Sequence, residues 1–257
     1  MLAAMGRKDF LVVIVVLALA ALLAAPAPAL GACPERSLGS WPAAGTELPR
    51  NGRIVLEGHG RDRAAILDLA KRGPRLLARA HEVELRVEAT YLGHRNLAIV
   101  VLAPVSALRT GQRYRLAFAR APRESGNLLS VEREAGAGGG LEWTASDPRG
   151  TPPLWVAQPW FIGFEAPGGQ DHPRHARIAI DVASSASWRL VAQVEGRGRP
   201  QRYLVEPRRG EALVGGDDCA AAFALEPGQR YRVTLSALDL AGTLVPAPGK
   251  VIEIAVP

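Results

Sequence analysis

Cysteine, lysine and aromatic residues are scarce in this chain of 257 residues. Its two cysteines, Cys33 and Cys219, allow at most one disulfide. Its cations are almost all arginine, since lysine occurs only at positions 8, 71 and 250. Acidic residues are interspersed among them, and no run of five cations occurs. The formal net charge of +6 therefore does not indicate a surface for nucleic acid, and we expect no nucleic-acid partner.

Catalytic signatures are also missing from the sequence. We find no G-x-S-x-G nucleophile elbow, no H-E-x-x-H pair and no loop that would cradle a phosphate. The glycine-rich stretch that ends at Gly140 lacks the following helix and lysine that a phosphate site needs, so it is more typical of a linker. No spacing of serine and histidine favours a triad. We therefore expect a protein that is not an enzyme and needs no cofactor.

The one long hydrophobic run lies at the N-terminus. A basic stretch around Arg7 precedes the apolar residues 11–25, and Pro26 and Pro28 end the run. A basic start, a short apolar segment and an exit of small residues are typical of a secretory signal peptide, and the run is shorter than the roughly 20 residues that cross a bilayer. We expect residues 1–32 to be a signal peptide, with a retained anchor as the alternative. The remainder would be exported to the periplasm, the outer-membrane or cell surface, or the extracellular space.

Hydrophobic alternation with a period of two predicts strands in the rest of the chain. In residues 81–91 apolar side chains occupy every second position and charged side chains most of the others, which indicates a strand with one wet face. Residues 96–104 are apolar without alternation and predict a buried strand. Short β-branched segments fill the second half, at spacings typical of a β-sandwich. The only helix candidate is Arg63–Lys71, which could equally be a strand with a hairpin.

Two similar segments indicate duplicated domains. ALRTGQRYRL at 107–116 and ALEPGQRYRV at 224–233 share leucine, glycine, glutamine, arginine and tyrosine at matching places. Their separation is far larger than the unit of a solenoid, which is about 20 to 50 residues. A proline- and glycine-containing segment, 146–153, lies between them and has the composition of a semi-rigid linker. We expect two domains, 33–148 and 149–257, hinged at this segment.

The second of these segments resembles a stretch of fibronectin type III and related immunoglobulin-like domains. Pro227 and Gly228 match the turn of that pattern, and Tyr231 matches the tyrosine whose hydroxyl bonds back to the turn. Tyr114 holds the same place in the first repeat, and residues 239–242 match the following turn. This resemblance implies that Tyr114 and Tyr231 are structural corners.

The opening of the mature chain resembles the first strands of bacterial immunoglobulin-like domains. The matching residues are Pro42, Gly45, Pro49 and Asn51. The two resemblances together imply an all-β fold of two immunoglobulin- or fibronectin type III-like β-sandwiches in tandem after a signal peptide. Such patterns specify a fold far better than a function.

One short run could bind a metal ion. Asp171, His172 and His175 would suit zinc or copper if the fold presented them together. Pro173 and the glycines before it place them on a loop without fixed geometry, so we expect a solvated turn and no metal site.

Aromatic residues gather around Pro159. They could form a carbohydrate or peptide platform, but core anchoring is the commoner role of such side chains, and we expect it here. The residues are Trp155, Trp160, Phe161 and Phe164.

Cys33 has two alternative fates. Residues 30–33 resemble the lipobox at which bacterial lipoproteins are cleaved and acylated, whereas Ala27–Ala29 is an ordinary cleavage site. Export leads to an oxidising space in which an even number of cysteines favours pairing. We expect a Cys33–Cys219 disulfide, with a lipid anchor on Cys33 as the alternative and the only reason for membrane attachment.

These observations together predict a non-catalytic envelope or surface protein. It would act as a scaffold, adhesion or interaction module whose partner is an unknown protein or cell-envelope component. The alternative is a small-ligand or metal-binding periplasmic protein or lipoprotein that uses residues 171–175.

Overall fold

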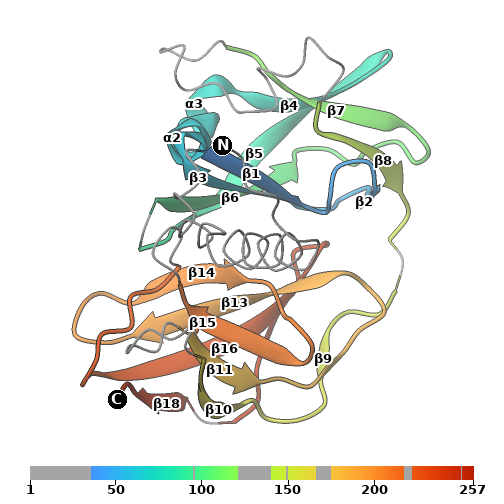
Figure 1. The fold of residues 1–257 in the computed structure, drawn as a ribbon. Helices are drawn as coiled ribbons and strands as arrows, with labels where there is room; N and C mark the ends of the chain where they lie inside the picture. Colours follow the sequence, from blue (N-terminus) through green and yellow to red (C-terminus); the bar gives the residue numbers. More distant parts are fainter. Residues whose placement is uncertain are drawn as a thin grey trace, which may run out of the picture. The chain divides into compact units, whose positions relative to one another are not determined.

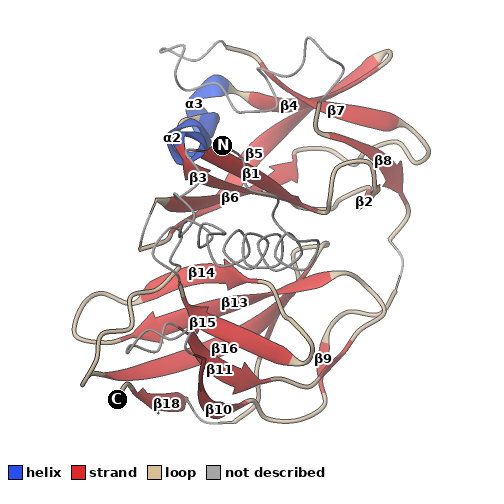
Figure 2. Cartoon of the chain, viewed as in Figure 1, coloured by secondary structure: helices blue, strands red, loops and turns tan. Residues whose placement is uncertain are grey.

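A computed structural model describes residues 36–94, 96–120, 140–148, 150–165, 175–216, 222–249 and 251–257 (Figure 1). The chain divides into two units, residues 1–33 and 34–257, and every described residue belongs to the second. Strands dominate the described part of this unit, and two short helices accompany them there (Figure 2). The predicted all-β class is confirmed. The boundary at residue 148 and the hinge stay predictions.

The first half forms an eight-stranded sheet in the order β1-β3-β6-β5-β4-β7-β8-β2. Pairing is antiparallel except between β2 and β8. The long strand β5 serves two partners, because residues 81–84 pair with β4 and residues 85–92 pair with β6. The strands are β1 (Arg36–Trp41), β2 (Glu47–Pro49), β3 (Ile54–Gly60), β4 (Pro74–Ala78), β5 (His81–Leu92), β6 (Leu97–Pro104), β7 (Arg113–Phe118) and β8 (Glu142–Ser146).

The helix candidate becomes two short helices, α2 (Arg61–Leu67) and α3 (Leu69–Arg72). Ile66 and Leu69 are buried in the same hydrophobic core as the sheet residues around them. Gly73 ends α3 in the left-handed conformation (φ 63°), which glycine adopts without steric cost, and Pro74 starts β4 directly after it. The helical interpretation of residues 63–71 was therefore right, and the hairpin was not.

The second half contains a three-stranded sheet, β10-β11-β15, and a larger sheet, β14-β13-β16-β17, in which β18 also pairs with β16. The short strands β9 and β12 pair with each other. Side chains of the three-stranded sheet and of the larger sheet pack into one hydrophobic core. The strands are β9 (Leu154–Trp155), β10 (Trp160–Glu165), β11 (His175–Ala179), β12 (Val182–Ala183), β13 (Trp188–Glu195), β14 (Gln201–Val205), β15 (Glu211–Gly215), β16 (Arg230–Asp239), β17 (Leu244–Pro246) and β18 (Ile252–Ala255).

Strands β3 and β6 are buried on both faces. Because side chains alternate along a strand, Leu56 and Val100 point into the core of the first half. Val55, Ile99 and Val101 point the other way, and they belong to the hydrophobic cluster of the second half. The apolar run without alternation in residues 96–104 is thus the sequence of a strand covered on two sides.

The two repeated segments adopt the same corner. The hydroxyl of Tyr114 accepts a hydrogen bond from the backbone N–H of Arg109 at 3.0 Å. The hydroxyl of Tyr231 accepts one from the N–H of Glu226 at 2.9 Å, again five residues upstream. Both tyrosines are buried. Each hydroxyl therefore holds the turn that leads into its own strand, and its contribution to stability is a prediction.

We expect Tyr114→Phe and Tyr231→Phe each to lower the free energy of unfolding by about 0.5–1.5 kcal/mol, because each leaves one backbone donor without its partner. Urea titration followed by circular dichroism measures the loss, and the β-sheet signal should persist. Tyr91→Phe, at a half-buried position of β5, is the matched control. Unchanged midpoints for both corner variants would refute the corner role.

Candidate functional site

The most elaborate polar arrangement in the described residues lies where the first half contacts the second. We call this contact the joint: the outer face of β3 and β6, the end of β1, and the facing residues of β13, β14 and the β16–β17 turn. The register sets the outer face, since Val55 lies opposite Val101 and Glu57 opposite Ile99. On the other side, Val191 lies opposite Leu204, and both belong to the same hydrophobic cluster as Val55 and Ile99.

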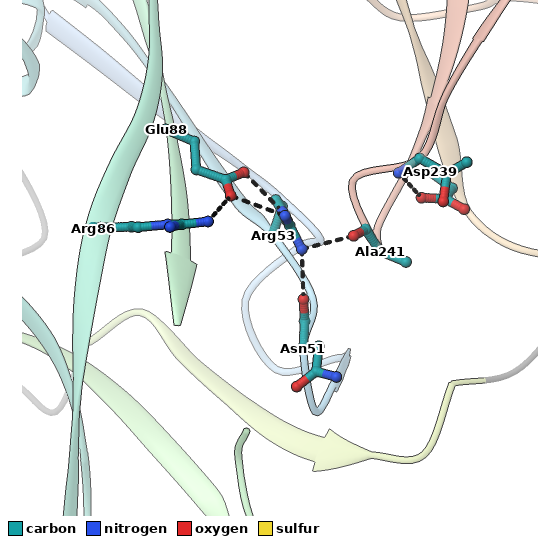
Figure 3. A network of polar contacts seen from close by, with 7 residues as sticks. Asn51, Arg53, Arg86, Glu88, Asp239 and Ala241 are labelled. Atoms are coloured by element: carbon teal, nitrogen blue, oxygen red, sulfur yellow. Dashed lines mark hydrogen bonds and ion pairs between the residues drawn. The ribbon is translucent and has the colours of Figure 1, made fainter. Parts of the chain in front are cut away.

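Arg53 links the two halves at the start of β3 (Figure 3). Its Nε and Nη2 donate to the two carboxylate oxygens of Glu88 at 2.8 and 2.9 Å. Its Nη1 donates to the carbonyl of Asn51 at 3.0 Å and to the carbonyl of Ala241, in the second half, at 2.6 Å. The backbone N–H of Arg53 also donates across the joint, to the carbonyl of Leu240 at 2.7 Å. The rigid fork of the guanidinium thus ties strand β5 to the β16–β17 turn.

The turn that receives Arg53 is built by Asp239. This buried carboxylate accepts a hydrogen bond from the N–H of Thr243 at 2.7 Å, a local bond that favours a turn. Gly242 has a φ of 88°, and a Cβ there would lie 2.5 Å from Nε of Arg53. Glycine is therefore required both by the backbone and by the approach of the guanidinium. The sequence predicted this turn but not the residue it faces.

Glu88 is kept charged by its two arginines. Burial alone would raise its pKa, but the hydrogen bonds from Arg53 and Arg86 outweigh burial and hold the pKa of Glu88 below its ordinary value. Glu88 therefore stabilises the fold above the ordinary pKa of a carboxyl and loses that contribution as the pH falls through its lowered pKa.

Trp41, the last residue of β1, contributes a buried aromatic ring to the joint. Its indole N–H donates to the hydroxyl of Ser187, in the second half, at 2.8 Å. The guanidinium of Arg189 lies 5.6 Å from the ring centroid, within the range of a cation–π contact. Arg189 is in turn paired with Glu206 at 2.9 Å. The buried ring is thus bound by polar contacts on its edge and on one face.

Glu57 and Tyr203 bridge the joint beside Trp41. The Tyr203 hydroxyl donates to a carboxylate oxygen of Glu57 at 2.7 Å. Burial raises the pKa of Glu57, against the lowering effects of Tyr203 and Arg189, and burial also raises the pKa of Tyr203. Two cavities of about 180 and 320 Å³ share Glu57 and Leu204 in their linings.

The predicted metal-binding residues fall largely outside the described part of the chain. Asp171 and His172 lie outside it, as do Cys33 and Cys219 of the predicted disulfide. His175 is the first residue of β11 and lines the larger cavity together with Tyr203. Among the described residues, no group of three or more histidine, aspartate, glutamate or cysteine side chains is arranged to hold a metal ion.

Three of the four aromatic residues near Pro159 are packed against the core, as expected. Phe161 and Phe164 meet edge to face with 5.0 Å between their centroids. Trp155 is also partly buried, and its indole N–H donates to the carbonyl of Val245 at 3.0 Å. Trp160 is the exception: 54% of it is exposed, so the core interpretation is wrong for this residue. Successive side chains of β10 point to opposite faces, so Trp160 points outward where its neighbour Phe161 points toward the core.

Comparison with known proteins finds only weak similarities to solved structures. No protein-family model and no curated protein matches the chain. Solved structures similar to it include fibronectin domains 1–3 of chicken CNTN1, with 16% identity, coverage of 88% of this chain and 66% of that one, and a TM-score of 0.28. The two N-terminal immunoglobulin domains of the Drosophila receptor tyrosine phosphatase DLAR show 10% identity, coverage of 87% and 100%, and a TM-score of 0.27.

An enzyme also appears among the similar structures. Pullulanase type I from Bacillus subtilis str. 168 shows 9% identity, coverage of 84% of this chain and a TM-score of 0.24. The present chain spans only 25% of the pullulanase chain. These similarities are too weak to carry an argument about activity. Within the described residues, no helix has the length and apolar character of a membrane span.

Sequence reasoning did not single out the residues that carry the joint. Arg53, Glu57 and Arg189 each stand alone in otherwise ordinary strand sequence, and none belongs to a motif. The available signal was the run 96–104, whose lack of alternation requires an apolar cover on both faces. This run indicates that a second surface covers the strand, but it does not indicate which residues form that surface.

We expect Arg53→Ala to lower the free energy of unfolding by roughly 1–3 kcal/mol, because it removes charge-assisted bonds at a largely buried position. Arg86→Ala is the matched control: Arg86 contacts the same carboxylate, but its side chain is 66% exposed, and its loss should cost under about 1 kcal/mol. Urea unfolding of both variants measures the difference. Equal losses would mean that the bond to Ala241 contributes nothing.

Proposed function

We propose that the chain is an exported, non-catalytic scaffold or interaction module of the cell envelope, in which two β-sandwiches are held in one fixed arrangement. The observation that carries the proposal is the joint. An apolar face and hydrogen bonds from Arg53, Trp41 and Tyr203 join the sandwiches. These contacts favour a rigid spacer, in place of the hinge that we expected from the sequence.

A rigid tandem serves a partner by presenting surfaces at a set distance and angle. The edge strand β10 supplies one such surface, since Trp160 and Ile162 are large apolar side chains that point outward. Exposed aromatic and aliphatic groups of this kind are enriched where proteins meet partners. The signal-peptide pattern of residues 1–32 supports export, and the partner would accordingly be an envelope or extracellular component.

Cell fractionation combined with photo-crosslinking tests this function. The full-length chain, carrying a photoreactive residue in place of Ile162, should appear in processed form outside the cytoplasm and form a discrete covalent adduct there. The matched control replaces Arg202, an exposed residue of the other sheet, and should give no such adduct. An unprocessed chain that remains in the cytoplasm would contradict the proposal, as would identical crosslinking at both positions.

A further inference from the structure

The joint contains an acidic residue, Glu57, beside apolar residues of strands β3, β6 and β14. Glu57 lies on the outer face of β3, two residues from Val55 and opposite Ile99 of β6. The facing strand β14 supplies Leu204, which shares both cavities with Glu57. A carboxylate at such a position loses much of its hydration when the two halves come together, and this loss disfavours its charged form.

Charged and titratable groups surround Glu57 from several elements. Strand β13 supplies Arg189 and the end of β14 supplies Glu206, and these two are paired with each other at 2.9 Å. Strand β14 also supplies the hydroxyl of Tyr203, and His175 and Arg208 line the larger cavity. His59 stands two residues away on β3 itself.

These neighbours do not neutralise Glu57. Arg189 favours its ionised form, but this guanidinium is shared with Glu206, whose charge opposes ionisation. The hydrogen bond from the Tyr203 hydroxyl also favours the ionised form, although a protonated carboxyl can still accept it through its carbonyl oxygen. The balance leaves burial as the largest influence, and it acts against the charge.

We propose that Glu57 makes the joint sensitive to pH: the two sandwiches are held more tightly when this carboxyl carries a proton and less tightly when it is ionised. Opening the joint returns Glu57 to water, where its charge is well solvated. Protonation of Glu57 therefore favours the closed arrangement in an acidic envelope, and its ionisation loosens the joint in a neutral one. This pH dependence is a property of the joint itself and goes beyond the proposed function.

The sign of the effect follows from linkage. The pKa of Glu57 is raised in the closed state above its ordinary value of 4.5, so closure is fully favoured below 4.5 and is weakened as the pH rises through the raised pKa. Glu88 acts in the opposite direction, because its pKa is lowered and its contribution is lost only as the pH falls below the ordinary value. A titration above 4.5 therefore separates the two glutamates.

Hydrogen exchange of amides that cross the joint measures its opening. The N–H of Arg53 donates to the carbonyl of Leu240 at 2.7 Å, and the N–H of His94 donates to the carbonyl of Ala222 at 3.2 Å. The N–H of Leu116 bonds to Leu141 within the first sandwich and serves as the internal reference. Exchange in the full mature chain would be recorded by NMR from about pH 5 to about pH 8 and corrected for the chemical exchange rate.

In the wild type we expect the protection of the Arg53 and His94 amides to fall by at least about twofold over this range, while Leu116 is unchanged. Glu57→Gln, which resembles the protonated acid, should abolish the fall and keep protection high. Glu84→Gln, at an exposed position of β5, should behave as the wild type. Because histidines titrate in the same range, the comparison with Glu57→Gln assigns the response.

Three results would overturn the proposal. Two are protection across the joint that does not change with pH and a fall that persists in Glu57→Gln. The third is a parallel fall at Leu116, since it would report unfolding of the first sandwich rather than opening of the joint. The crosslinking and localisation outcomes do not depend on this titration, so failure of one proposal leaves the other standing.

Discussion

The arrangement of the described chain depends on one constraint: strand β6 and the first residues of strand β3 are apolar on both faces. One face fills the core of the first sandwich, and the other would meet water if nothing covered it. Burying a single valine or isoleucine side chain contributes roughly 1.5–3 kcal/mol, so leaving Val55, Ile99 and Val101 exposed would be costly. The second sandwich supplies the cover through β13 and β14, and its hydrophobic cluster includes these residues.

Arg53 and Glu88 fix the geometry of the joint, whereas Glu57 makes its stability depend on pH. Arg53 and Glu88 form a fork-to-fork pair whose geometry also positions the Ala241 carbonyl, so this end of the joint specifies one alignment of the two halves. Glu57 lies on the outer face of β3 beside Val55 and Ile99, and its raised pKa means that its charge opposes closure. Arg53 and its partners thus fix the geometry of the joint, and the protonation of Glu57, in our proposal, sets how tightly it closes. This is the physical basis of the scaffold that we propose.

The sequence predicted the elements better than the contacts between them. Strict alternation identified β5, and the tyrosine and glycine spacing identified the two corners, because these signals are local. The run 96–104 correctly predicted a buried strand, but alternation cannot tell which distant surface covers its outer face. Arg53 and Glu57 look like ordinary solvent-facing charges in the sequence, and the contacts of Arg53 with Ala241 and of Glu57 with Tyr203 depend on how the second half packs against them. Trp160 was misjudged for the same reason, since its direction depends on the alternation within β10.

Small-angle X-ray scattering of the mature chain at about pH 5 tests the fixed joint most directly, by comparing the wild type with Ile99→Asp and with Thr90→Asp, a control at an exposed position of β5. The account predicts that the wild type and Thr90→Asp scatter as one rigid particle. Ile99→Asp, which places a charge on the outer face of β6, should scatter as two linked bodies with a larger maximum dimension. A wild-type chain that already scatters as two hinged domains, or an Ile99→Asp profile identical to the rigid one, would contradict it.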